Sequence, residues 1–223
     1  MAKFYPAPGG GTSGPQQYIE FDTNGYDPGN GQISWDADFE TLQVGLNGVN
    51  LQVGQEHVVR VKNNTVSEIA DGTVVMFTGS TGDTVTVAPA VSDGTYPAYA
   101  LVGVATEAIA ADGFGLVTQY GFVNQIKTDY TGWIVGTLLY ADPSTPGALT
   151  NTAPSAPAWD FPIAAVTRVQ AESGRILVRA IPSLGNATII NTDGDPGTKI
   201  YVGTVDPSTI YTLEAGDVWI DNS

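Results

Sequence analysis

Residues 41–53 read TLQVGLNGVNLQV, and this stretch decides the fold class. Asn47-Gly48 stands at its centre, and Asn-Gly is the preferred pair for a two-residue type I′ turn because both central residues need a positive φ. Apolar and polar residues alternate on both sides of this turn, with the period of a β-strand. The stretch therefore predicts a β-hairpin with one apolar face, made of Leu42, Val44, Leu46, Val49, Leu51 and Val53.

The strand after the hairpin alternates in the same way. Residues 56–62 read EHVVRVK, and we predict that the inward side chains are His57, Val59 and Val61 and the outward ones Glu56, Val58, Arg60 and Lys62. Further short strands follow between clusters of Gly, Asp, Ser and Pro, at 73–78, 84–88, 99–104, 115–123, 133–140, 162–169 and 174–181. The stretch 106–111 is the one place where we expect a helical turn.

The composition agrees with many strands and tight turns. The chain has 223 residues, with 27 glycines, 14 prolines and only 14% charged residues. We expect an all-β fold with an antiparallel β-barrel or sandwich core, an extended N-terminal arm and a small C-terminal β segment.

Four segments are predicted. Residues 1–16 form a flexible arm in which Phe4 and Tyr5 could anchor the chain to a partner; the alternative is a disordered tail. Residues 17–62 form an N-terminal hairpin region, and residues 63–181 form the barrel or sandwich. Residues 182–223 are too few to sustain a core alone, so we expect them to pack on the main domain or to intertwine with copies of themselves.

The charge excludes one class of partner. The formal net charge is −15, from 23 acidic against 8 basic residues, and no cluster of Lys and Arg exists along the sequence. Nucleic-acid binding requires such a cationic cluster, so we expect no nucleic-acid partner. No apolar run reaches the length of a membrane span and no signal peptide is visible, so we expect a soluble protein made in a cytoplasm, without membrane insertion.

The sequence offers little material for catalysis, and we expect no enzyme, no catalytic residue and no cofactor. There is no cysteine, and the single histidine, His57, is better explained as a core or interface residue than as the base of a Ser-His-Asp triad. One chain cannot assemble a zinc site from one histidine, although three copies of His57 on a trimer axis could. Paired carboxylates for glycoside hydrolysis stay open, because they need only two acids in a cleft.

Two acidic stretches and the tryptophans have two interpretations each. Residues 22–27 and 193–195 could bind calcium through oxygen ligands, but Asn-Gly and Asp-Gly also explain them as turns without metal. Trp219 stands between apolar and acidic neighbours, as Trp35, Trp133 and Trp159 stand in mixed surroundings. Sugar stacking is one interpretation of these residues, and burial in an oligomer interface is the preferred one.

A series of motifs resembles a known family. Residues 51–65 read LQVGQEHVVRVKNNT and residues 69–75 read IADGTVV, preceded by Ser34-Trp35-Asp36. This resembles a module of bacteriophage tail-fibre and head-fibre proteins, whose pattern runs LQVGQE-x-VVRV-x-NNT-x-x-x-I-x-x-GTVV. Further segments similar to that module follow in order, within 101–110, 115–121, 133–141, 147–150, 154–157 and 176–179. The middle part is also similar to small β-barrel capsid-decoration proteins, and residues 215–221 to elements near the ends of phage fibres.

The resemblance covers residues 33–181 and implies a trimeric, β-rich component of the exterior of a virion, without catalysis. It implies partners among its own copies and the major capsid protein or other virion proteins. It transfers no catalytic residue and does not decide between head and tail. The preferred function is a capsid decoration protein or short head fibre, and the alternative is a short tail fibre that binds a host glycan near Trp219. A glycan depolymerase is the third function, from the enzyme class, and the resemblance does not imply it.

Overall fold

The structure, a computed structural model, describes residues 21–24, 26–46, 48–155, 157–180, 200–203 and 218–221, the last two ranges as backbone alone. The chain divides into two units, Met1–Pro182 and Ser183–Ser223. In the second unit the described strands are β13 (Ile200–Gly203) and β14 (Val218–Asp221), which pair in parallel. The predicted arm, residues 1–16, lies outside the described residues.

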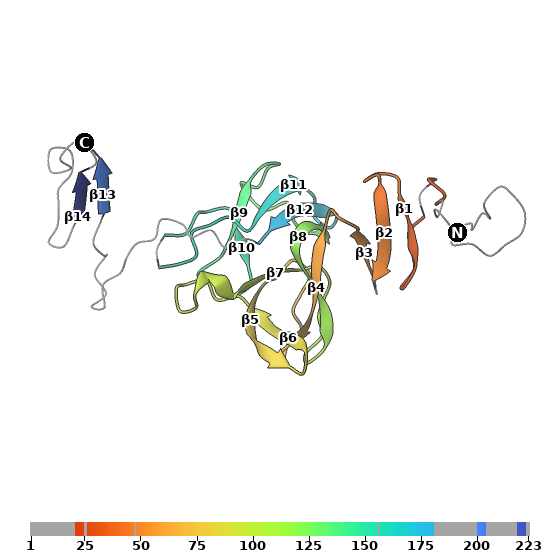
Figure 1. Ribbon diagram of the computed structural model, residues 1–223, viewed down its shortest axis with the longest axis horizontal. Helices are drawn as coiled ribbons and strands as arrows, with labels where there is room; N and C mark the ends of the chain where they lie inside the picture. The colour runs from red at the N-terminus through yellow and green to blue at the C-terminus, as the bar shows by residue number, and fades with distance from the viewer. Residues whose placement is uncertain are drawn as a thin grey trace, which may run out of the picture. The chain divides into compact units, whose positions relative to one another are not determined.

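The predicted hairpin is confirmed. Strands β2 (Thr41–Leu46) and β3 (Val49–Gln52) are antiparallel, with Val44 opposite Leu51 and Leu46 opposite Val49. Gly48 has a φ of 99°, the positive value that a two-residue hairpin turn demands. Strand β1 (Ile33–Asp36) pairs with the other edge of β2 and completes a three-stranded sheet, drawn in orange and brown in Figure 1.

Five strands form a closed barrel, and the fold is all-β as predicted. They are β4 (His57–Asn63), β5 (Val74–Thr81), β6 (Thr84–Pro89), β7 (Leu101–Ala105) and β8 (Phe114–Ile126). The strands neighbour one another in the order β8-β4-β6-β5-β7, and the pairing of β7 with β8 closes the ring. We predicted that most of the strand at 57–63 belongs to the hairpin region, residues 17–62, but it is a barrel strand.

One pair of barrel strands departs from the predicted antiparallel arrangement. Strand β4 pairs with β6 in parallel, with Val61 opposite Val85. The reason is the connection from β4 to β5, which does not turn back as a hairpin. Within it Ile69 forms a bridge with Ile109, so β5 pairs with β6 and β7 instead of with β4.

The barrel strands are part of a nine-stranded sheet that continues beyond the barrel through β8, and we call this continuation the second sheet. The second half of β8 pairs with β12 (Gly174–Arg179), and β11 (Ala164–Arg168), β9 (Leu138–Ala141) and β10 (Leu149–Thr150) follow in that order. Figure 1 shows these strands beside the barrel within the same unit. The helix of the described part is the 3₁₀ turn η1 (Ala98–Ala100), and no described helix is long and apolar enough to cross a membrane.

Two apolar cores hold these sheets. The smaller fills the barrel with Val61, Ile69, Val75, Val87, Ala105, Ile109 and Val117. The larger includes Val74 and Val104 of the barrel together with residues of the second sheet such as Leu139, Ile176 and Val178. In β12 each inward residue alternates with an outward one, whereas β5 and β7 carry consecutive buried residues because both of their faces are covered.

Some local predictions are wrong. Residues 106–111 contain no helix, because Ile109 is fully buried in the barrel and exchanges two backbone hydrogen bonds with Ile69 (2.8 and 2.9 Å). Trp133 lies in a turn before β9 rather than in a strand. Trp133 and Trp159 are buried in the larger core of their own chain, so an oligomer interface does not explain their burial.

The start of β4 also differs from the prediction. Glu56 is buried and His57 is exposed, the reverse of the expected alternation. The register of β4 against β8 shifts between His57 and Val58, and such a bulge moves the alternation by one position. Beyond the bulge Val61 points inward and Arg60 outward, as predicted. His57 is therefore not a core histidine, and its place in an interface stays a prediction.

Asn63 fixes the end of the barrel. Its side chain is fully buried, and its Nδ2 donates hydrogen bonds to the carbonyl oxygens of Ser67 (2.8 Å), Ile109 (3.0 Å) and Ala110 (3.1 Å). Its Oδ1 accepts from the backbone nitrogen of Thr65 at 2.9 Å. One side chain thus forms hydrogen bonds with backbone groups of two connections, the one from β4 to β5 and the one from β7 to β8.

We expect Asn63→Ala to lower the free energy of unfolding by about 3 kcal/mol, because it removes the buried hydrogen bonds that this side chain makes to the backbone, each worth about 1 kcal/mol. Urea denaturation measures this change. Asn124→Ala, at an exposed position of β8, is the control and should change stability little. Equal effects of the two substitutions would contradict this role of Asn63.

Candidate functional site

The structure does not describe the side chains of the three residues predicted to dock or to bind a glycan. Phe4 and Tyr5 fall in the range 1–20, of which the structure describes nothing. Trp219 lies in β14, but only its backbone is described. The predicted docking arm and the predicted glycan contact therefore stay predictions, and the candidate surfaces below come from the first unit.

The first surface is the apolar face of the three-stranded sheet. Cross-strand register places eight side chains on one side: Ile33, Trp35, Leu42, Val44, Leu46, Val49, Leu51 and Val53. None of them is fully buried, and Ile33 and Val53 are 54% and 44% exposed. We call this surface the apolar sheet face. It carries no charged residue.

The opposite, polar face of the same sheet is the covered one. Gln43 is only 4% exposed, and its Nε2 donates to the carbonyl oxygen of Tyr26 at 2.9 Å. A Cβ on Gly45 would come within 2.2 Å of the carbonyl oxygen of Gly29, so the segment before β1 packs directly on this face. The described chain thus covers the polar side and leaves the apolar side half open. A hairpin that packs only against its own chain normally buries its apolar side and leaves its polar side exposed to water.

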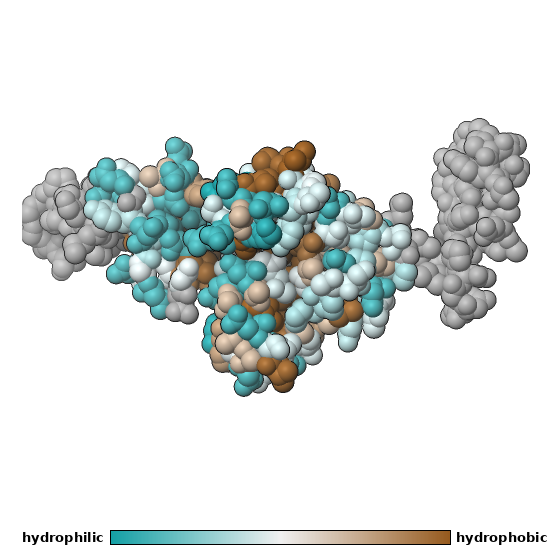
Figure 2. Space-filling view, turned by 180° about the vertical axis from the view of Figure 1, so that it is seen from behind, coloured by the Kyte–Doolittle hydropathy of each residue, from teal (hydrophilic) through white to brown (hydrophobic). Residues whose placement is uncertain are grey.

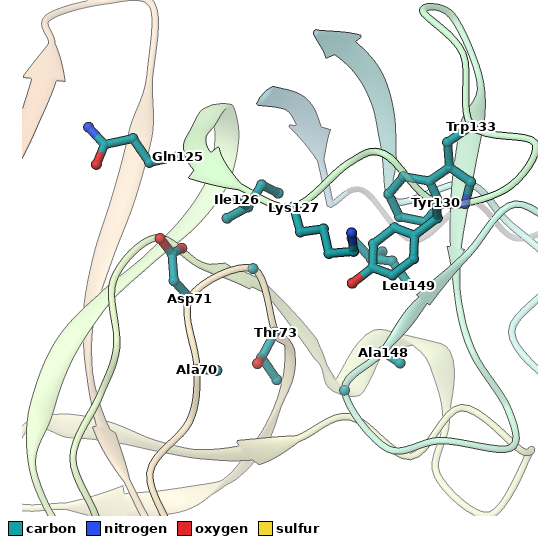
Figure 3. A pocket seen from close by; sticks show the side chains of 12 residues that line it. Ala70, Asp71, Thr73, Gln125, Ile126, Lys127, Tyr130, Trp133, Ala148 and Leu149 are labelled. Atoms are coloured by element: carbon teal, nitrogen blue, oxygen red, sulfur yellow. The ribbon is translucent and has the colours of Figure 1, made fainter. Parts of the chain in front are cut away.

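The second surface is a pocket of about 500 Å³ between the barrel and the second sheet. Three chain segments line it: the connection before β5, the end of β8 with the loop that follows, and the turn before β10. Figure 3 shows Asp71 and Gln125 toward one end, Tyr130 and Trp133 toward the other, and the side chain of Lys127 between them.

Asp71 is the carboxylate of this pocket. Burial raises its pKa to about 6, against the opposing hydrogen bond from the backbone of Gly72, and the charge of Glu107 adds to the rise. Its Oδ1 is buried and has no hydrogen-bond partner among the described residues. A half-buried acid with an unused oxygen is a feature of binding sites.

Aromatic rings form the other end. The rings of Tyr130 and Trp133 lie 4.7 Å apart between centroids, and Tyr130 is 48% exposed. Lys127 Nζ lies 5.1 Å from the Tyr130 ring centroid and forms an ion pair with Asp129. Gln125 has a φ of 61°, a strained backbone conformation of the kind that often occurs at ligand sites.

The pocket is better suited to binding than to cleavage. Among its lining residues Asp71 is the one carboxylate, whereas glycoside hydrolysis normally uses two. An exposed aromatic ring, a carboxylate and an amide are the groups that hold a sugar ring and its hydroxyls. The sequence did not point to this pocket because its residues are spread over three separate segments.

The acidic stretch 22–27 has the geometry of a turn. Asp22 Oδ1 accepts hydrogen bonds from the backbone nitrogen and the Nδ2 of Asn24, at 3.0 and 2.7 Å. Within the described ranges no group of three or more His, Cys, Asp and Glu residues is arranged to hold a metal ion. The second acidic stretch, 193–195, lies outside those ranges.

Comparison with known proteins gives few matches. No protein-family model and no curated protein matches the chain. Among solved structures, the chain matches one described as "The crystal structure of head fiber gp8.5 N base in bacteriophage phi29", with 12% identity over 58% of this chain and 100% of that chain and a TM-score of 0.35. A TM-score this low does not establish a common fold.

The raised pKa of Asp71 predicts a pH-dependent stability. The folded chain binds the proton more tightly than the unfolded chain, so ionised Asp71 destabilises the fold above pH 6, and this penalty disappears as the pH falls from about 6 to about 4. Asp71→Asn removes the charge at every pH. We expect it to raise Tm by about 2–4 °C at pH 8, after discounting for solvent exposure, and by less than about 1 °C at pH 4.

Thermal unfolding followed by circular dichroism at the two pH values measures this difference. Asp83→Asn, at an exposed position in the turn between β5 and β6, is the matched control. A gain from Asp71→Asn that is the same at both pH values would contradict the assignment.

Proposed function

We propose that this protein is a homotrimeric structural component of the exterior of a bacteriophage particle, either a capsid decoration protein or a short head fibre. It acts by adhesion and assembly and not by catalysis, and it uses no cofactor. Its partners are its own copies and the major capsid protein or another virion protein, with residues 1–16 as the docking arm. Nucleic acid and membrane lipid are not among them.

The observation that carries self-association is the apolar sheet face. Eight apolar side chains on one face, none charged and two about half exposed, present a surface that water does not stabilise. A partner that covers them gains about 25 cal/mol for each Å² of apolar surface removed from water. A second and a third copy supply the same face, which is how symmetric oligomers form.

The sequence motifs are the reason for proposing a bacteriophage particle. The ordered motifs between residues 33 and 181 resemble a module of phage fibre proteins, and these motifs lie on β1, on the end of the hairpin, on barrel strands and on strands of the second sheet. The all-β barrel fits such a component, whose strands need protected edges.

A lysine on the apolar sheet face tests self-association. We expect Ile33→Lys to raise the trimer dissociation constant at least about tenfold, because the interface would have to bury an unpaired charge. Sedimentation velocity across micromolar concentrations measures it. The control Ala37→Lys adds the same charge at an exposed position in the turn between β1 and β2. A well-folded wild-type monomer at these concentrations would overturn the proposal.

Adhesion to a host glycan is the second candidate function, and the pocket around Asp71 and Tyr130 favours it. A short tail fibre would use this pocket or Trp219 to bind host polysaccharide. The depolymerase remains the third candidate, and the release of reducing ends from host polysaccharide would support it over both. Binding of the trimer to empty heads but not to host cells distinguishes decoration from adhesion.

Under the glycan interpretation, we expect Tyr130→Ala to weaken binding to host polysaccharide at least about fivefold, because a stacking surface worth about 1 kcal/mol is lost. Glycan-array binding or calorimetry measures it. Tyr99→Ala removes another exposed tyrosine, on η1, and should leave binding unchanged. Absence of any glycan binding by the wild type would remove this candidate.

A further inference from the structure

The second sheet has an outer face that no described residue covers completely. Opposite the larger core, the register aligns Phe122 of β8, Leu177 of β12, Ala165 of β11 and Leu138 of β9 in one cross-strand row. Leu138, at the end of this row, is 49% exposed, and the turn before it carries the exposed Ile134 and Val135. Figure 2 shows that hydrophobic residues gather in patches on this unit instead of being spread evenly.

Arginines flank the apolar row on both sides. Arg175 and Arg168 are opposite each other on β12 and β11, and Arg179 is opposite Tyr120 of β8. The guanidinium of Arg175 lies 4.5 Å from the ring centroid of Phe122, which joins the two features into one surface. We call this surface, the row together with its three arginines, the arginine face.

These arginines have no acidic partner in the described part of the chain. The ion pairs found there are Lys62–Asp112 and Lys127–Asp129, and neither includes an arginine. Strands β8, β9, β11 and β12 contain no Asp or Glu at all. In a chain with 23 acidic and 8 basic residues, such a separation of charges leaves a positive surface available to an external acidic group.

The chain itself contains the complementary surface. Between residues 4 and 59 there is no Lys or Arg, and the acids of this acid-only region are Glu20, Asp22, Asp27, Asp36, Asp38, Glu40 and Glu56. Phe39, between two of these acids, packs its ring 5.7 Å from Phe122 within the same chain. The acid-only region therefore already reaches the β8 edge of the arginine face, while Arg168, Arg179 and Leu138 remain exposed.

We infer that the arginine face docks onto the acid-only region of a neighbouring copy. The inference rests on the self-association proposed above and adds how the copies orient: head to tail, with two different surfaces in each contact. Contacts of this kind close into a ring when the rotation allows it. They also let a chain of net charge −15 associate with its own copies, because each contact brings opposite charges together.

Charge reversal on each side of the contact tests the inference. Arg168→Glu/Arg179→Glu changes two exposed positions of the arginine face, and Asp38→Lys/Glu40→Lys changes two exposed positions of the acid-only region. We expect each pair alone to raise the trimer dissociation constant at least about tenfold at 50 mM salt, and less at 500 mM salt. The chain that carries all four substitutions should recover the trimer, because opposite charges face each other again.

Arg60→Glu is the matched control, since Arg60 is an exposed arginine on β4, outside the second sheet. A wild-type monomer would overturn the proposed self-association and this inference together. A wild-type trimer that tolerates the Arg168/Arg179 variant would overturn this inference alone. Failure of the four-substitution chain to recover, or arginine-dependent binding of single-stranded DNA or heparin with assembly unchanged, would show that the face serves another partner and would overturn it too.

Discussion

The structure depends on strand β8, whose backbone forms hydrogen bonds with other strands along both of its edges. Its 13 residues pair with β4 along one edge and with β7 and then β12 along the other. Every buried amide must have a partner, so a strand of this length has to belong to both the barrel and the second sheet. Removing it would open the barrel and detach the second sheet in one step.

Two glycines make this shared strand possible. A Cβ on Gly115 would come within 2.6 Å of Ile109 in the barrel core, and a Cβ on Gly121, whose φ is 130°, within 2.7 Å of Glu56. The space at Gly121 admits the Glu56 carboxylate, which accepts hydrogen bonds from the backbone nitrogens of Phe122 (3.0 Å) and Gln52 (3.3 Å). Burial raises the pKa of Glu56 despite these bonds. The same carboxylate thus ties the end of the hairpin to β8.

Local patterns predicted the elements well, and long-range pairing explains the rest. Asn47-Gly48 fixed the hairpin register because a two-residue turn allows one alignment of its strands. The parallel pair of β4 and β6 was not predictable, since it follows from Ile109 meeting Ile69 across 40 positions of the chain. Alternation also predicted most of the apolar sheet face. The arginine face was not predicted, because each arginine of the second sheet is a single outward residue in an alternating strand, and only the register brings them together.

The long-range pairing of β4 also sets the order in which this protein can form. The pairing of β2 with β3 is local, so the hairpin can form as soon as its residues leave the ribosome, whereas β4 must wait for β8, which ends at Ile126. During synthesis the earliest folded element is thus the one with the uncovered apolar side. Nascent chains on one messenger RNA would present these sides to each other before any barrel has closed, which would make co-translational pairing of chains a route into the proposed oligomer.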